Sequence, residues 1–168
     1  MTTTGTDGLR MRRATIEDAA ALLSWRNDPV TRRMSLQTDE VPLDRHLRWL
    51  ERALSTPGRV ILIAEDATTG APVGMCRFDI DDVRTDRAEI SVNLAPEHRG
   101  RGLGGALLGE GIAAFAVSHP SVVTLTAVIR PSNLASVRLF EAAGFVRTGD
   151  EPALLHYERS SAGAEQLP

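Results

Sequence analysis

The 168-residue sequence predicts one α/β domain, and three observations support this fold class. Segments such as 43–54 and 103–118 carry apolar residues at helical spacing, whereas 60–64 and 87–94 show the continuous or alternating apolar pattern of strands. The length and a hydrophobic fraction of 42% suit one globular domain. Neither a repeat nor a linker divides the chain.

The first half of the chain predicts a strand at 9–12 and two helices. The first helix begins at Thr15, an N-cap residue followed by Glu17 and Asp18, and it ends near 27–29. The second helix covers 43–54, between Pro42 and the Pro57-Gly58 pair.

Three strands are predicted in the middle of the chain, at 60–64, 73–80 and 87–94. The first is apolar throughout, which is typical of a strand covered on both faces, and the turn 68–72 predicts a hairpin with the second. The third strand alternates, so that Glu89 lies on its polar side together with Arg87, Ser91 and Asn93.

The last third predicts a helix at 103–118, a strand at 122–129, a helix at 133–143 and a final strand pair at 145–147 and 153–158. We expect the domain to cover 9–159, with flexible tails at 1–8 and 160–168.

The charged residues exclude several classes of protein. All 19 cations are arginine, so no lysine serves a Walker A phosphate loop, a kinase site or a pyridoxal-phosphate Schiff base. Arginine stays protonated, so a general base must come from another residue type or from water. The net charge of −3 argues against a nucleic-acid partner.

The remaining composition predicts a cytoplasmic protein. Cys76 is alone, so no internal disulfide forms, and the four histidines lack metal-ligand spacing, so no metal is expected. Residues 1–8 lack the apolar core of a signal peptide, and no apolar run is long enough to cross a membrane.

The glycine-rich stretch 94–105, between a strand and a helix, predicts an anion site, because backbone N–H groups and a helix dipole converge there. Its Gly100–Gly105 part also fits the dinucleotide pattern G-x-G-x-x-G, but the following segment 125–128 has no acidic ribose ligand. A flexible connector without a ligand is the third interpretation.

Two blocks of the chain resemble the GNAT superfamily of acyl-CoA-dependent N-acetyltransferases. They are Arg99-x-x-Gly102-x-Gly104 and the helix 133–145, and the resemblance extends over about 9–158. It implies a mixed, mostly antiparallel sheet of six to seven strands with about four flanking helices. This sheet would open between its fourth and fifth strands, here 87–94 and 122–129, to hold acetyl-CoA.

The resemblance also implies which residues bind acetyl-CoA. The pantetheine arm would pair near Leu94, Ala95 and Pro96, and Asn133 would cap its helix, bond the pantetheine, or do both. The pyrophosphate would bind to N–H groups of the turn formed by Arg99, Gly100, Arg101, Gly102, Leu103 and Gly104. Gly102 and Gly104 would lack a Cβ because the backbone approaches the phosphates closely.

The implied reaction is direct attack of a primary amine on the thioester, which needs a group that removes the amine proton. Glu89 is the candidate base; the alternative is an exposed glutamate paired with Arg87 or Arg77. Phe140 occupies the position where many relatives have the tyrosine that protonates the thiolate. Ser136 is therefore the candidate near the sulfur, with Tyr157 in reserve.

The segments 25–29 and 46–50 resemble amino-sugar N-acetyltransferases of the nonulosonic (pseudaminic) acid pathway, and partly the ribosomal-protein and resistance branches. Arg26 and His46 would then bind the acceptor; an ion-pair partner and an ordinary helix-face histidine are the alternatives. We expect a small-molecule amine, with an amino sugar or sugar nucleotide first.

A protein N-terminus and an antibiotic amine are the alternative acceptors, and a non-catalytic acyl-CoA-binding module is the alternative from another class. The oligomeric state is open, with a homodimer among the options.

Overall fold

The computed structural model describes residues 8–160, so the predicted tails lie almost entirely outside it. Its seven-stranded sheet is antiparallel except for the β4–β5 pair, as predicted for a mixed, mostly antiparallel sheet. In spatial order the strands are β1 (Leu9–Arg13), β2 (Arg59–Asp66), β3 (Pro72–Ile80), β4 (Arg87–Leu94), β5 (Thr124–Ile129), β7 (Leu154–Ser160) and β6 (Val146–Glu151).

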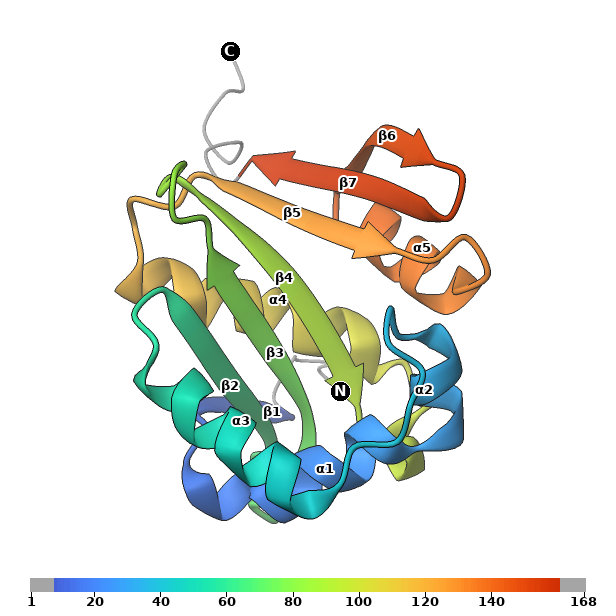
Figure 1. The fold of residues 1–168 in the computed structure, drawn as a ribbon. Helices are drawn as coiled ribbons and strands as arrows, with labels where there is room; N and C mark the ends of the chain where they lie inside the picture. Colours follow the sequence, from blue (N-terminus) through green and yellow to red (C-terminus); the bar gives the residue numbers. More distant parts are fainter. Residues whose placement is uncertain (1–7, 161–168) are drawn as a thin grey trace, which may run out of the picture.

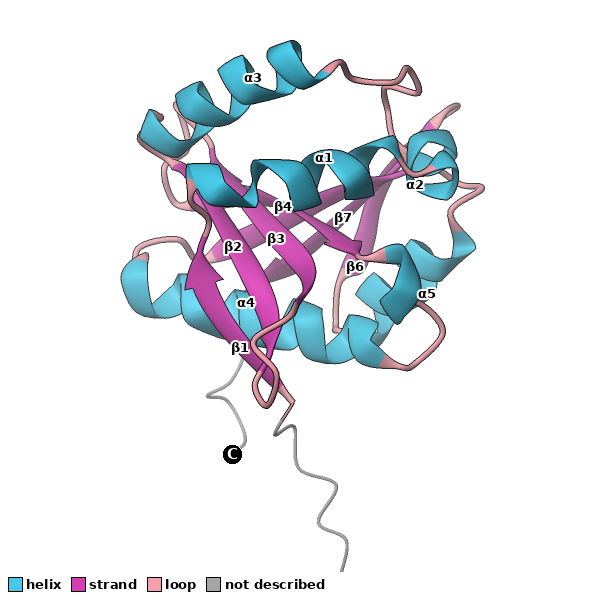
Figure 2. Ribbon diagram, turned by 90° about the horizontal axis from the view of Figure 1, so that it is seen from below, coloured by secondary structure: helices cyan, strands magenta, loops and turns pink. Residues whose placement is uncertain are grey.

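Helices cover both faces of this sheet and enclose a smaller core on one face and a larger core on the other. On one face α1 (Ala19–Asn27) and α3 (Leu43–Ser55) enclose a core against β2 and β3, with Trp25, Leu50 and Ile63 buried. On the other face, α4 (Leu103–Ser118) and α5 (Leu134–Ala142) cover the larger core (Figure 2). No described helix is long and apolar enough to span a membrane.

The first predicted helix divides into two pieces and an additional short helix follows it, which is the main difference from the expected fold. A 3-10 turn, Ile16–Asp18, leads into α1, and a separate short helix, α2 (Pro29–Met34), follows. Asp28 starts α2 because its carboxylate accepts from the N–H groups of Val30 (3.1 Å) and Thr31 (3.0 Å). The Asp-Pro pair predicted as the end of one helix is therefore also the beginning of the next.

The fourth and fifth strands separate after a short parallel contact. Pairing runs only from Arg87–Glu89 to Thr124–Thr126, and beyond it β4 and β5 diverge (Figure 1). The opening expected between the fourth and fifth strands is thus present, with its closed end at Glu89 and Thr126. The unpaired half of β4 ends at the glycine-rich turn.

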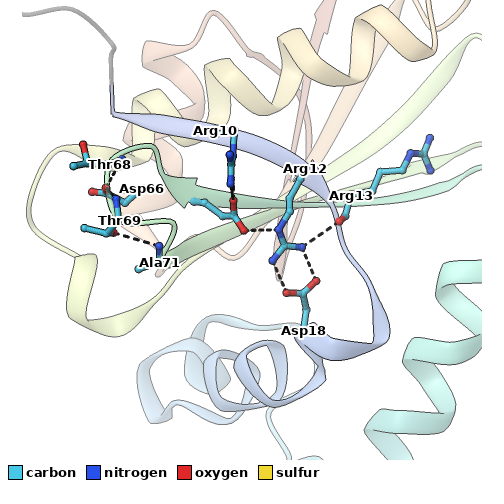
Figure 3. A network of polar contacts seen from close by, with 9 residues as sticks. Arg10, Arg12, Arg13, Asp18, Asp66, Thr68, Thr69 and Ala71 are labelled. Atoms are coloured by element: carbon cyan, nitrogen blue, oxygen red, sulfur yellow. Dashed lines mark hydrogen bonds and ion pairs between the residues drawn. The ribbon is translucent and has the colours of Figure 1, made fainter.

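A network of ion pairs around the buried carboxylate of Glu65 connects β2, β1 and the 3-10 turn before α1. Glu65 of β2 is 6% exposed and accepts from Arg10 (2.6 Å) and from Arg12 on the neighbouring strand. Arg12 also donates two 2.8 Å bonds to Asp18, in the 3-10 turn before α1 (Figure 3). The Arg12 guanidinium is the main cause that lowers the pKa values of both carboxyl groups.

Candidate active site

Backbone groups of β4 point into the opening beyond its contact with β5. The N–H of Ala95 bonds the carbonyl of Val73 on β3 at 2.9 Å, and antiparallel strands alternate the direction of these groups. The N–H groups of Val92 and Leu94 therefore face the β5 side, where the two strands have parted. Donors arranged in this way are available to an extended ligand that lies along β4.

The turn after β4 presents an open helix N-terminus. Gly100 and Gly102 both have a φ of +73°, and Gly102 is the N-cap of α4 without a side chain that satisfies the first-turn N–H groups. A Cβ on Gly102 would meet no atom within 4 Å, so the space over this turn is free. Free donors, the helix dipole and open space together fit a phosphate group.

Gly104 has a different reason to lack a side chain. A Cβ there would lie 3.3 Å from Cδ1 of Leu139 on α5 and 3.9 Å from Cδ1 of Leu94. The glycine lets α4 and α5 approach each other closely, so its small size serves helix packing. The predicted close approach of phosphate remains a hypothesis for Gly102.

The two arginines of the turn lie differently. The side chain of Arg99 is directed to α2, where it donates to Asp28 Oδ2 (2.8 Å) and Thr31 Oγ1 (2.7 Å). Arg101 is exposed. The Arg99 guanidinium is the first cause of the lowered pKa of Asp28.

Glu89 lines a surface groove of about 530 Å³ on the sheet face that carries α1 and α3, over the part formed by β4, β5, β7 and β6. Arg87 pairs with Glu158 and Arg77 with Asp79, so both arginines proposed as partners of Glu89 are engaged elsewhere. The lining contains no arginine; it consists of Glu89, Thr126, Ala127, Val128, Thr148, Gly149, Glu151, His156, Tyr157 and Glu158.

His156 and Glu158 of β7 line this groove and were absent from the predicted site. Strand register aligns Glu89 with Thr126 and Thr126 with Glu158, and it places His156 opposite Val128 one step closer to the opening. The pattern of β7 contains the signal, because Leu155 and Tyr157 are core residues and the residues that alternate with them, His156 and Glu158, must face the other side. Finding it requires the strand order, since β7 lies far from β4 in sequence.

The predicted residues of α5 lie at its N-terminus. Asn133 is the N-cap and accepts from the N–H of Ser136 (3.2 Å), so the predicted cap is present and the amide nitrogen of Asn133 is left for another partner. Ser136 is half-buried and does not line the groove with Glu89. Phe140 is buried edge-to-face against Phe145.

The reserve proton donor Tyr157 and the lone cysteine Cys76 are both buried in the core. Tyr157 is 1% exposed, and its hydroxyl donates to Glu141 Oε1 of α5 (3.0 Å), on the face of the sheet opposite Glu89. Burial is the main cause of its raised pKa. Cys76 is fully buried, and burial raises the pKa of its thiol to about 12, which excludes it as a nucleophile at neutral pH.

Arg26 and His46 do not line the groove. Arg26, at the end of α1, donates to the carbonyl of Gln37 (2.6 Å), and burial is the main cause of its lowered pKa. His46 is 3% exposed, stacks on Trp49 with ring centroids 5.7 Å apart and has its pKa lowered by burial. No cluster of metal-ligating side chains occurs among the described residues.

Comparison with known proteins agrees with this arrangement. The family described as "Acetyltransferase (GNAT) domain" matches residues 8–146. L-amino acid N-acyltransferase MnaT of Escherichia coli (strain K12) is 30% identical, over 86% of this chain and 83% of its own.

Solved structures are similar over most of the fold. Ribosomal-protein-alanine N-acetyltransferase from Brucella melitensis has a TM-score of 0.73 at 29% identity, covering 90% of this chain and 99% of its own. Spermidine N-acetyltransferase from Vibrio cholerae, in complex with CoA and spermine, has a TM-score of 0.81 at 16% identity, covering 92% and 96%.

Proposed function

Because the chain belongs to the GNAT family and is an acetyl-CoA-dependent N-acetyltransferase, we propose that its acceptor is the primary amine of a small, positively charged molecule, with an amino sugar as the first candidate. The observation that carries this proposal is the charge of the groove beside the opening. Three carboxylates line it, from Glu89, Glu151 and Glu158; Arg87 pairs with Glu158 from outside the lining, which itself includes no arginine, so Glu89 and Glu151 carry the negative charge.

The residues at the opening fit acetyl-CoA. The free N–H groups at the start of α4 suit its pyrophosphate, and those of Val92 and Leu94 suit its pantetheine amides. Bound acetyl-CoA supplies a thioester carbonyl for the amine to attack and a sulfur that leaves as a thiolate. An N–H near Leu94 would stabilise the negative charge that develops on the carbonyl oxygen.

Charge complementarity supports one class of acceptor over another. An ammonium group is attracted to the carboxylates of the groove, whereas the diphosphate of a sugar nucleotide is repelled. Arg26 and His46, the residues expected to bind the acceptor, lie outside the groove lining. We therefore place an amino sugar with several amines before a sugar nucleotide. An amino acid is the second candidate, because MnaT carries that activity in its name.

Glu89 is the group proposed to remove the ammonium proton, directly or through one water. It makes no ion pair within the described part of the chain, and it lies where β4 and β5 part, beside the place proposed for the thioester. Ser136 is the proposed proton donor to the thiolate, because Phe140 has no hydroxyl and the hydroxyl of Tyr157 is bonded to Glu141. An unprotonated amine then attacks without a covalent enzyme intermediate.

A thiol-release assay with four amines tests the acceptor. The panel contains paromomycin, a UDP-linked amino sugar, L-methionine sulfone and a peptide that begins with alanine. We expect the highest kcat/KM for paromomycin, and a rise in its KM with added salt because salt screens the groove carboxylates. A preference for the UDP-linked sugar or for the peptide would overturn the proposal.

The base is tested by Glu89→Gln. Turnover should fall most at low pH, where almost all of the acceptor amine is protonated, and the acid limb of the pH–rate profile should change shape. Asp79→Asn is the matched control, because Asp79 lies opposite Glu89 on β3 but pairs with Arg59 and Arg77 outside the groove. If both variants keep the profile of the unmodified protein, Glu89 is not the base.

A further inference from the structure

The segment 28–38, called the strap below, is bonded to both sides of the opening between β4 and β5. It contains α2 and the turn that follows, and α2 lies beside the end of β4 (Figure 1). From the β4 side, Arg99 reaches the first residues of the strap. Its guanidinium donates to Asp28 Oδ2 (2.8 Å), to Thr31 Oγ1 (2.7 Å) and, more weakly, to the carbonyl of Leu94 (3.4 Å).

From the β5 side, Arg130 reaches the other end of the strap. This residue directly follows β5, and it donates to the carbonyls of Ser35 (2.8 Å) and Leu36 (3.1 Å). The next two carbonyls are also bonded, that of Gln37 to Arg26 (2.6 Å) and that of Thr38 to Arg32 (3.0 Å). Arginine donors thus hold four successive carbonyls.

The contact of Arg99 is well suited to transmit a change at the turn. Its main chain belongs to the turn proposed to hold the pyrophosphate, and its N–H closes the 3-10 turn of 96–98 on the carbonyl of Pro96 (3.3 Å). The side chains of Arg99 and Asp28 are 30% and 17% exposed, so the ion pair is shielded from much of the solvent. A ligand that fixes the backbone of the turn also fixes the base of this side chain.

We propose that Arg99 is a positioning residue that couples occupation of the pyrophosphate turn to the order of the strap, through its bonds to Asp28 and Thr31. Its side chain then acts on the strap and not as a phosphate ligand. This inference rests on the proposed assignment of the turn to acetyl-CoA. The strap and the groove both adjoin the opening, so binding of the co-substrate prepares the acceptor side of the enzyme.

Amide hydrogen exchange of 29–38, measured by mass spectrometry with and without CoA, tests the coupling. In the unmodified protein, saturating CoA should slow exchange of this segment at least fivefold. In Arg99→Ala the segment should exchange faster, and CoA should slow it less than twofold. Coupling between two sites is reciprocal. The Kd of Arg99→Ala for CoA, measured by calorimetry, should therefore rise by a factor no larger than the factor of CoA protection that this variant loses in 29–38.

Asp28→Asn approaches the same contact from the strap. Asparagine still caps α2 but lacks the charge that pairs with Arg99, so it should lose the coupling as Arg99→Ala does. The double variant should lose no more than Arg99→Ala, since all three variants lack the same ion pair. Arg84→Ala, an exposed arginine in the loop between β3 and β4 and outside both the turn and the strap, is the control and should keep the full CoA protection of 29–38.

Three results would overturn the inference. One is equal CoA protection of 29–38 in the unmodified protein and in either variant, and another is no protection in the unmodified protein. The third is a roughly hundredfold loss of CoA affinity in Arg99→Ala with unchanged exchange, which would make Arg99 a phosphate ligand. If the unmodified protein does not bind CoA, the assignment of the turn fails and this inference fails with it.

Discussion

Two reasons can explain a glycine at position 102, the positive φ of its backbone and the space that a phosphate needs above the turn. Replacing Gly102 with alanine separates them. At a φ of +73° any side chain strains the backbone, by about 1–2 kcal/mol. No atom lies within 4 Å of the new Cβ, so no steric clash adds to that strain. For a chain of this length the strain should lower Tm by about 2–8 °C.

The effect on ligand binding has a different origin. If a phosphate lies over the turn, the new methyl group occupies its space and displaces at least one charge-assisted hydrogen bond, worth about 1.5–3 kcal/mol. The Kd for CoA should therefore rise about ten- to hundredfold or more. Backbone strain alone acts on the free and bound protein alike and leaves Kd unchanged.

Gly70→Ala is the matched control for this measurement. Gly70 has a φ of +72° and also has no atom within 4 Å of its ideal Cβ, but it lies in the turn between β2 and β3. Both variants should lose similar stability by thermal unfolding, and only Gly102→Ala should lose CoA affinity by calorimetry. A Kd within twofold of the unmodified value in Gly102→Ala would refute the phosphate assignment.

Four further substitutions test the ion network, the packing and the role of the Tyr157 hydroxyl. Glu65→Gln should cost about 2–3 kcal/mol at pH 7 by urea unfolding, below the usual range for a broken buried pair because the Arg12 side chain is 34% exposed. The pKa of Glu65 in the folded protein lies below its ordinary value of 4.5. The stabilisation by its carboxylate is therefore fully present above pH 4.5, and the stability difference between the two proteins should shrink as the pH falls from there through the folded pKa. Gly111→Ala should destabilise by about 1–3 kcal/mol despite its better helix propensity, because the new Cβ would lie 2.5 Å from Sγ of Cys76, and Cys76→Ala should relieve this cost. Tyr157→Phe should cost about 1 kcal/mol of stability and leave kcat within twofold; a large fall in kcat at unchanged KM would reinstate its hydroxyl as the acid.

Most elements were predictable because their signals are local. The alternation of 87–94 and the apolar spacing of 103–118 identify β4 and α4 with the observed bounds. The helix α2 was not predicted from the sequence, because an Asp-Pro pair is found both where a helix ends and where one begins, and Asp28-Pro29 was interpreted only as an end. Six residues of α2 carry too short a pattern to decide between the two.

The side chains of the site were less predictable, because their partners are distant in sequence. The glycines of the turn indicate an anion site by themselves, but the direction of Arg99 depends on Asp28, 71 residues earlier. Likewise, His156 joins the face of Glu89 only through the order of β4, β5 and β7. His46 shows the opposite case, because a helix-face histidine is buried as soon as α3 packs on α1.

The parting of β4 from β5 leaves two strand edges with unpaired main-chain groups inside the molecule. Such edges usually invite a strand from another chain, and proteins at risk of aggregation cover, charge or distort them. Here Thr31 contacts Asn93 (3.5 Å) and Arg99 contacts Leu94, so the far end of the β4 edge is covered. At the rims of the sheet, β1 carries three arginines and β6 has an irregular register after Arg147. The main-chain donors of β4 that face the opening thus lie within the sheet, while its two outer edges are charged or irregular.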